Sequence, residues 1–497
     1  MCKNDIEKTA QDLKNLLGNQ ENIIIKKINV GKDIPIKAFI IYINAIADKN
    51  IIDTDILKPL MLHTNENLND KEDINNYLCE TYISLSNIYI EQDINKVIAA
   101  LKRGKTAVFT EISIGYILAD TIGGKYRNII EPEDEASTRD SKEGFVENLE
   151  TNISMIRRRL KDDRLIIETL TLGRRTQTDI SLLYIGDIAN DNVINELRKR
   201  LNSIDVDNII ASGMLEQYIE HEPYCIFPQY VSSQRPDRIV SEILEGKAAI
   251  VIDGSPSVLL APSTFFDFFQ SVDDYYNRTI IATFIRILRM LAVFIVITLP
   301  SIYLTLLKFN AELIPIKFIT PIIQSRTGIA LTPFLEILSM EIMVEFLREG
   351  GLRLPSKIAQ TLSVVGGIII GDTAIQSKIV SPSTLLIVGI TVISSFLIPN
   401  YDMSISIRFI RFPMLILSNF LGIFGISIGW FFILIKLFYM QNYGVEYLAF
   451  FKDDMKDTLV RVPLWKMNKR PVITSPKDNI RQTDFRKKWN GGNNKNE

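Results

Sequence analysis

The sequence predicts an α/β (mixed) soluble N-terminal region of two repeated subdomains, followed by an all-α multi-span membrane domain. Three observations indicate this fold class: a length of 497 residues, which suggests about three domains, a repeat in the first half, and long uncharged runs in the second half. The predicted parts are, in chain order, subdomain 1 (1–120), an acidic linker (121–147), subdomain 2 with its connector (148–285), a transmembrane helical domain (286–445) and a basic C-terminal tail (446–497).

The two subdomains are predicted from an internal repeat. Shifting the chain along itself without a gap places 22–52 on 164–194, with nine of 31 positions identical. The same shift pairs Gly31 with Gly173, and Gly104-Lys105 with Gly246-Lys247. One constant offset across separated blocks indicates a duplicated structure rather than a shared composition. Each copy is expected to run strand, glycine turn, strand, helix, and later helix, Gly-Lys turn and β-hairpin.

Charge divides the chain in the same places. The 56 Lys and Arg residues nearly balance the 58 Asp and Glu residues. This balance excludes a bulk basic nucleic-acid binder, so no nucleic acid is expected as a partner. The stretch 1–280 is net acidic, and the polar, acidic segment 131–144 between the two copies predicts an exposed linker. The following region and the tail are net basic.

A basic cluster stands out in this acidic half. It consists of five arginines: Arg157, Arg158, Arg159, Arg174 and Arg175. Anion binding or an interaction surface is one interpretation. Ion pairing with Glu147, Glu150 and Asp162 is the favoured one, because charge clusters on a protein surface are usually balanced locally.

Uncharged runs predict the membrane spans. Residues 290–307, 379–401 and 412–435 carry no charge, and a helix needs about 20 apolar residues to cross a hydrocarbon core. A fourth span is predicted over 360–379, with one ionisable group, Asp372. That carboxylate is expected to face protein or water rather than lipid, or to pair with Lys378 near the end of the span.

The segment 331–347 is apolar but contains three glutamates. Glu341 and Glu345 share a helix face with Arg348, whereas Glu336 points elsewhere. The segment either lies in the interface as an amphipathic helix or crosses with that face toward a protein or water interior. The second interpretation is favoured, because lipid cannot face these carboxylates.

The distribution of basic residues leaves the number of spans between four and six. Basic residues favour the cytosolic side of a membrane. The arginines before the first span therefore place its start in the cytosol, and the basic tail places the end of the last span there too. Two ends on the same side require an even number of spans. With four spans, however, Arg408 and Arg411 would lie outside. A half-length or re-entrant element within 412–440 would satisfy both constraints, because the segment is long and rich in glycine.

The remaining motifs argue against catalysis. The cysteines and histidines are too few and too far apart for a disulfide framework or a structural metal site: Cys2, Cys79, Cys225, His63 and His221. We find no catalytic triad, paired-carboxylate or phosphate-loop pattern, so neither an enzyme nor a cofactor is expected. The N-terminus does not read as a signal peptide, which places the soluble region in the cytosol.

Several motifs follow one another in a familiar order. They are GFVENLETNISMIRRRL (144–160), GRRTQTDISLLYIGDIAN (173–190), FPQ (227–229), RPD (235–237), DGSPSVLLAPSTFFDFFQSVDDYYNR (253–278), ELIP (312–315), SPSTLLIVGITVISSFLIPNY (381–401) and RFIRFP (408–413). From about 120 to 450, the chain resembles the A subunit of GerA-type bacterial spore germinant receptors. The first 120 residues carry less of this resemblance.

The resemblance implies a multi-pass protein of the spore inner membrane, working with a permease-like B subunit and a lipoprotein C subunit. Such receptors sense nutrients and trigger germination with release of monovalent cations, and the A subunit is implied to oligomerise into an ion channel. Oligomerisation would gather Glu341 and Glu345 into a ring of carboxylates that selects cations, with Arg348 on the same face neutralising part of their charge. The alternative is that Arg348 only forms salt bridges with these glutamates within one chain. Two alternatives stay open: a transporter-like permease with a regulatory domain, and a non-conducting scaffold for the B and C subunits.

Overall fold

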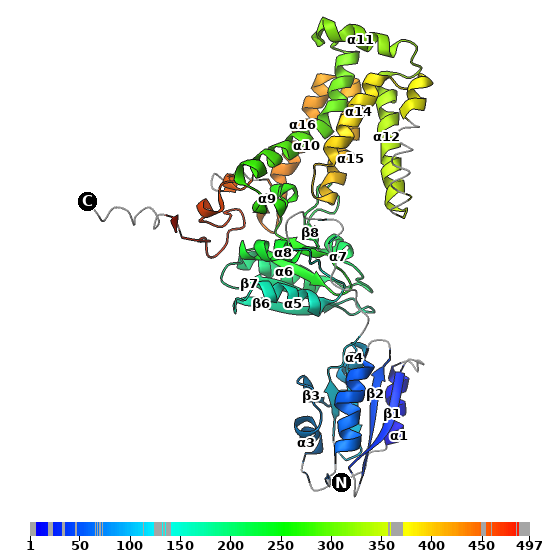
Figure 1. Cartoon of the computed structure of the whole chain (residues 1–497), viewed down its shortest axis with the longest axis vertical. Coiled ribbons are helices and arrows are strands. Elements are labelled where there is room, and N and C mark those ends of the chain that lie inside the picture. Colours follow the sequence, from blue (N-terminus) through cyan, green and yellow to red (C-terminus); the bar gives the residue numbers. More distant parts are fainter. Residues whose placement is uncertain are drawn as a thin grey trace, which may run out of the picture. The chain divides into compact units, whose positions relative to one another are not determined.

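A computed structural model describes most of the chain, and the chain divides into two compact units, 1–126 and 127–497 (Figure 1). The described residues are 6–17, 23–31, 35–44, 47–64, 66, 68, 71, 73–112, 114–123, 132, 135, 141–355, 358, 371–448, 454–458, 460–483 and 485–486.

The first unit is an antiparallel sheet with helices on both faces. Its strands lie in the order β1-β2-β4-β5-β3. Their bounds are β1 Ile23–Val30, β2 Ile36–Ile43, β3 Ile88–Glu91, β4 Thr106–Thr110 and β5 Tyr116–Ala119. Successive side chains of a strand point to opposite faces. Phe39 and Ile41 therefore join the core under α1 (Ile6–Leu16) and α4 (Ile94–Lys102). Ile40 joins the core on the other face, with α3 (Ile74–Thr81) and the helical turns of 49–63.

The second unit begins with the same architecture. Its sheet has the order β6-β7-β9-β10-β8. The strand bounds are β6 Leu165–Leu172, β7 Thr178–Ile185, β8 Val231–Ser233, β9 Ala248–Ile252 and β10 Val258–Ala261, and the helices are α5 Leu149–Arg159, α6 Asp191–Ser203, α7 Ser212–Ile219 and α8 Pro236–Leu244. Four strands and α8 begin and end at the positions that the offset of the sequence repeat assigns to their counterparts in the first unit. The predicted repeat is confirmed.

The paired glycines explain why the offset is so regular. Gly31 and Gly173 turn the chain between the first two strands of each copy, with φ of 97° and 88°. Gly104 and Gly246 follow the equivalent helices, with φ of 91° and 96°. Only glycine adopts such dihedral angles without steric cost, so both copies keep the same turn at the same position.

Replacing Gly173 by alanine tests this turn. The alanine would have to adopt a backbone φ of +88°, and its Cβ would lie 2.4 Å from Oγ1 of Thr176. We expect Gly173→Ala to lower the free energy of unfolding by about 1–2 kcal/mol. Gly213→Ala is the matched control, because Gly213 lies on α7 with open space around it. That change should stabilise by up to about 1 kcal/mol. Thermal unfolding of both variants is the measurement, and equal effects would contradict the explanation.

The predicted acidic linker falls largely outside the described residues. Of 121–147, residues 124–131, 133–134 and 136–140 are not described. Glu135 corrects the expectation of a simply exposed segment. Its carboxylate pairs with Arg238 of α8 at 2.6 Å, and both side chains are mostly buried. This part of the linker is therefore fastened to subdomain 2.

The helical region follows subdomain 2 (Figure 1). Its helices are α10 Thr279–Lys308, α11 Ile316–Arg326, α12 Pro333–Leu352, α14 Pro382–Ser395, α15 Tyr401–Leu421 and α16 Ile423–Tyr439, and residues 371–376 are also helical. Among the described residues, two helices, α10 and α15, are long and apolar enough to cross a membrane by length and composition. The number of spans therefore stays a prediction.

Two of the predicted spans do not form one long helix each in the structure. The helix within 379–401 has only 14 residues, which is about 21 Å of rise against a core of about 30 Å. The single span predicted over 412–435 is wrong, because Gly422 ends α15 with φ of 57° and α16 starts at the next residue. Phe309 packs against Gly422 so closely that a Cβ would lie 3.1 Å from its ring. Most of the predicted span 360–379 lies outside the described residues.

Both ends of the helical region meet subdomain 2. After α16, a short hairpin of β11 (Gln441–Asn442) and β12 (Val445–Glu446) enters its core. The buried Tyr447 hydroxyl donates to the carbonyl of Pro228 at 2.8 Å. The start of α10 and the end of α16 thus both lie beside subdomain 2.

Candidate functional site

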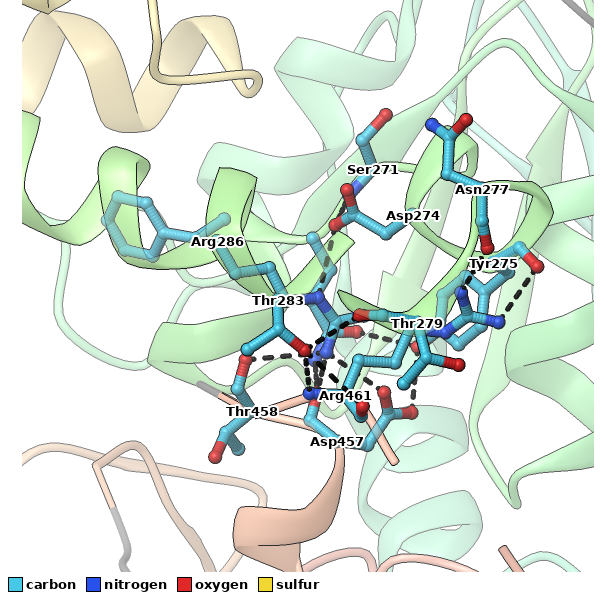
Figure 2. Close-up of polar contacts among 12 residues, drawn as sticks. Ser271, Asp274, Tyr275, Asn277, Thr279, Thr283, Arg286, Asp457, Thr458 and Arg461 are labelled. Atoms are coloured by element: carbon cyan, nitrogen blue, oxygen red, sulfur yellow. Dashed lines mark hydrogen bonds and ion pairs between the residues drawn. The ribbon is translucent and has the colours of Figure 1, made fainter. Parts of the chain in front are cut away.

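A buried ionic network joins subdomain 2 to the first long helix (Figure 2). Asp274 lies on the short helix α9 (Asp273–Tyr276) and is almost completely buried. Its Oδ2 accepts from Arg289 Nη1 at 2.6 Å and from Arg286 Nε at 3.2 Å. The same oxygen accepts from the backbone N–H of Ser271 at 3.2 Å. One carboxylate therefore holds two arginines of the first three turns of α10.

The C-terminal tail completes this network. Asp457 Oδ1 accepts from Arg286 Nη1 at 2.9 Å, and its Oδ2 accepts from the Tyr275 hydroxyl at 2.9 Å. Arg461 donates to the carbonyls of Tyr275 at 2.9 Å and Asn277 at 2.7 Å, as Figure 2 shows. The connector, α10 and the tail are thereby tied at one point, which we call the junction.

The junction is poorly solvated, and it holds three arginines and two carboxylates. Two arginines of α10 face two carboxylates, Asp274 and Asp457. Burial raises the pKa of the Asp457 carboxyl, and Arg286 offsets part of this rise. Burial also raises the pKa of the Tyr275 hydroxyl well above its ordinary value and lowers the pKa of Arg461. Removing one partner from such a site leaves an uncompensated buried charge.

Sequence reasoning did not identify the junction. In the sequence, Arg286 and Arg289 indicate only the orientation of the first predicted span, and Asp457 lies in none of the recognised motifs. Asp274 lies within a quoted motif, but nothing in that motif indicates its partners. The two ends of the Arg286–Asp457 bond are 171 residues apart, so no local spacing reveals them.

A cavity of about 420 Å³ lies beside the junction, between subdomain 2 and the tail. Its walls carry paired charges. Lys247 contacts Glu242 at 2.8 Å and Asp267 at 2.6 Å, and Arg481 of the tail contacts Glu245 at 2.6 Å. In the part of the chain that the structure describes, no group of three or more metal-binding side chains is assembled. The charged side chains of the cavity walls are thus arranged in pairs.

Glu245 makes the tail contact sensitive to pH. Burial raises the pKa of its carboxyl to about 7, although Arg481 opposes the shift. A carboxyl with a raised pKa in the folded state adds stability below its unfolded pKa, and this contribution is lost as the pH rises through about 7. We expect Glu245→Gln to remove this decline between pH 4.5 and 7. Melting temperatures of the full chain across this range are the measurement, with the exposed Glu349→Gln as control. An unchanged slope in Glu245→Gln would contradict the assignment.

The structure brings three of the four predicted intramembrane residues into a second ionic cluster, namely Glu341, Glu345 and Arg348. Glu341 of α12 is fully buried and lies 2.7 Å from Arg411 of α15. Glu345 contacts Arg408 at 2.5 Å and Arg411 at 3.2 Å. The expected neighbour, Arg348, lies 3.8 Å from Glu345 and donates to Ser395 Oγ of α14 at 2.5 Å. This face of α12 therefore packs against protein, as expected, and its passage through a membrane stays a prediction.

The main partners of these glutamates come from another helix than expected. Arg408 and Arg411 lie in the RFIRFP motif of α15, whereas the prediction used Arg348 on the same helix face. The Asp372 side chain is exposed, and among the described residues no ion pair joins it to the cluster. Glu336 forms a separate buried contact with Arg326 at 2.7 Å and with the Ser381 hydroxyl at 2.6 Å.

The arginine cluster of subdomain 2 is used for surface ion pairs. Arg158 and Arg159 share Glu143, at 2.6 and 2.7 Å. Arg174 pairs with Asp205, and Arg175 lies 3.5 Å from Asp207. The favoured ion-pair interpretation is confirmed for these four arginines, and the partners that the structure shows are Glu143, Asp205 and Asp207. Exposed pairs of this kind contribute little to stability, about 0–1 kcal/mol each.

Comparison with known proteins decides the family. A profile described as "Bacillus/Clostridium GerA spore germination protein" matches residues 11–473. The chain belongs to the GerA family. Spore germination protein KA of Bacillus subtilis (strain 168) is 37% identical over 481 residues, which is 96% of this chain and 88% of that protein. Spore germination protein B1 of the same strain is 35% identical, over 96% of this chain and 99% of that protein.

One solved structure is also similar to this chain in sequence. The N-terminal domain of the A subunit of the Bacillus megaterium spore germinant receptor GerK3 is 32% identical to this chain. The match covers 53% of this chain and 97% of that domain, with a TM-score of 0.22. The GerA profile starts at residue 11, so subdomain 1 also belongs to the matched region, although its motifs resemble the family less. The junction and the α12–α15 cluster both lie within it.

Proposed function

We propose that this GerA-family chain is the A subunit of a nutrient germinant receptor in the spore inner membrane. Its helical region lies in the membrane, and its N-terminal region lies in the cytosol. It works with a permease-like B subunit and a lipoprotein C subunit, and it is not an enzyme. Membership of the family and two helices of membrane-spanning length and composition support this proposal.

Within the receptor, the chain oligomerises into the ion-conducting component. The junction supports this mechanism, because one buried aspartate holds the first turns of α10. A displacement of subdomain 2 would move Asp274 and, through the bonds to Arg286 and Arg289, the helix. The tail adds a second hold on Arg286 through Asp457. The soluble and helical regions are thus coupled by charge pairs that cannot separate cheaply in a buried site.

One observation favours a non-conducting scaffold as the alternative function. Glu341 and Glu345 use their carboxylates for pairs within one chain, with Arg411 and Arg408. A ring of pore carboxylates needs charges that face a shared axis. In the scaffold, the same pairs would only fix α12 against α15 and present the bundle to the B and C subunits.

Ion flux through the purified chain separates the two functions. The full-length chain is reconstituted into potassium-loaded liposomes, and potassium release is followed with an ion-selective electrode. A channel component releases potassium above the level of empty liposomes, and the release depends on the oligomeric state. A chain that is inserted and oligomeric yet gives no release would support the scaffold. Spores lacking the gene, with and without the restored gene, test the germination role independently through nutrient-triggered potassium release.

A further inference from the structure

The loop after α7 carries a fully exposed aromatic side chain on a well-fixed backbone. Tyr224 is 99% exposed. The buried Gln229 closes the loop, because its Oε1 accepts from the backbone N–H of His221 at 2.9 Å. Its Nε2 donates to the carbonyl of Glu222 at 2.9 Å. A tyrosine held outward by an ordered loop is a strong candidate for contact with something outside the chain.

Two helices of the bundle fix the position of this loop. Ser406, in the second turn of α15, donates to the carbonyl of Ile226 at 2.6 Å. Lys436, in the last turn of α16, pairs with Glu222. The loop therefore lies where α15 begins and α16 ends, on the side of subdomain 2, and Figure 1 shows α7 close to this end of α15.

Two more exposed tyrosines lie at the same end of the helical bundle as this loop. Tyr401 is the first residue of α15, and Tyr439 is the last residue of α16. They are 52% and 82% exposed. Farther along α15, the exposed side chains are apolar, with Ile405 and Phe409 among them. Tyrosines at helix ends next to an apolar exposed surface are typical of the boundary between lipid and water.

We propose that the loop 220–226 lies on the bilayer surface, with the Tyr224 side chain among the phospholipid headgroups. The ring is apolar and the hydroxyl is polar, which suits a layer that is apolar on one side and wet on the other. The half-exposed Ile226 adds apolar area on the same loop. The loop would then set the depth at which subdomain 2 rests against the membrane.

Lipid is the occupant that the surroundings favour. Tyr224, Tyr401 and Tyr439 come from three separate segments, yet the contacts of Ser406 and Lys436 bring them to one end of the bundle. The headgroup layer of a bilayer explains why three exposed tyrosines share one end of the bundle. Binding of a single protein partner would not require this arrangement. The inference rests on the membrane placement in the proposed function but not on ion conduction.

Tryptophan fluorescence in vesicles tests the position of Tyr224. The full-length Tyr224→Trp variant is reconstituted into vesicles of phosphatidylcholine and phosphatidylglycerol, with or without phosphatidylcholine that carries a nitroxide on its headgroup. The emission of the three native tryptophans is subtracted with the unmodified chain. We expect the added emission to lose most of its intensity with the nitroxide lipid. Ile166→Trp is the control on β6, the sheet edge opposite β8, and should lose none.

Flotation of the same vesicles keeps the outcomes distinct. A chain that fails to float with the vesicles would remove the membrane placement itself and this inference with it. A chain that floats, but whose Tyr224→Trp emission ignores the nitroxide lipid, would overturn only the inference. The inference would also be overturned if the emission intensity were unchanged by the nitroxide lipid but the emission wavelength shifted when the other receptor subunits were added. That result would indicate a protein contact.

Discussion

Replacing Asp274 by alanine is expected to destabilise the chain by about 3–5 kcal/mol, the cost typical of breaking a buried ion pair from one side. Asp274 is the sole carboxylate shown to pair with Arg289 among the described residues, and it shares Arg286 with Asp457. Its removal leaves the Arg289 guanidinium in a site with little water, where the carbonyl of Phe269 still accepts from it. The first turns of α10 would lose their hold on the connector.

Thermal unfolding of the purified full-length chain in detergent measures this effect. A loss of this size lowers the melting temperature by roughly 10 °C for a domain of about 200 residues. Asp205→Ala is the matched control, because Asp205 also pairs with an arginine but is 66% exposed. Its effect should be at most about 1 kcal/mol. Equal melting temperatures for Asp274→Ala and Asp205→Ala would contradict the role of the junction.

Asp457 provides a graded test of the same network. Asp457→Asn keeps an acceptor for Tyr275 but removes the charge that faces Arg286. Asp457 is more exposed than Asp274, and Arg286 retains Asp274 in this variant. The loss should therefore be smaller than in Asp274→Ala. The tail should also become easier to cleave by protease, because Asp457 is one of the contacts that fasten it to α10.

The repeat could be read from the sequence because it depends on short-range rules. A glycine with positive φ and strands of alternating burial leave marks that survive duplication. Gly31 and Gly173 fall at equal positions for this reason. The mixed α/β class of the soluble region and the helical class of the second half followed from the same local patterns.

The ionic sites could not be read in the same way. Arg411 and Glu341 lie on different helices. Arg286 precedes most of the helical region in the sequence, whereas Asp457 follows it. Helix spacing therefore gives no indication of either pair. An uncharged run also looks identical whether it forms one helix or two. At Gly422, the break depends on its dihedral angle and on the ring of Phe309, and the second of these is a contact between distant residues.

Replacing Arg411 by methionine is the second change with a large expected effect. Arg411 is 1% exposed, and Glu341, its partner at 2.7 Å, is completely buried. Methionine keeps much of the buried volume but leaves the Glu341 carboxylate without its cation. We expect a loss of about 3–5 kcal/mol in the free energy of unfolding. Glu345 should be affected less, because Arg408 remains 2.5 Å away.

A double variant distinguishes an unpaired charge from a damaged core. Glu341→Leu in the Arg411→Met background removes the stranded carboxylate, and apolar replacement of both partners of a buried pair is often neutral or stabilising. The double variant should therefore recover most of the loss, with a coupling energy above about 2 kcal/mol. Arg353→Met is the control, because Arg353 and Glu349 form an exposed pair at the end of α12. This substitution should change the free energy of unfolding by at most about 1 kcal/mol. A double variant as unstable as Arg411→Met would contradict the pairing.

The recovered double variant also decides what the Glu341 charge does in spores. If Glu341 contributes to a cation-selective ring, receptors that carry Glu341→Leu with Arg411→Met assemble at normal abundance but release potassium slowly after nutrient addition. If the pair only fastens α12 to α15, the same receptors release potassium at the normal rate, because the packing between the helices is kept. Since Glu341 already has a cation within its own chain, a normal rate would remove it from the pore and leave Glu345, which is 28% exposed, as the remaining carboxylate of that helix face.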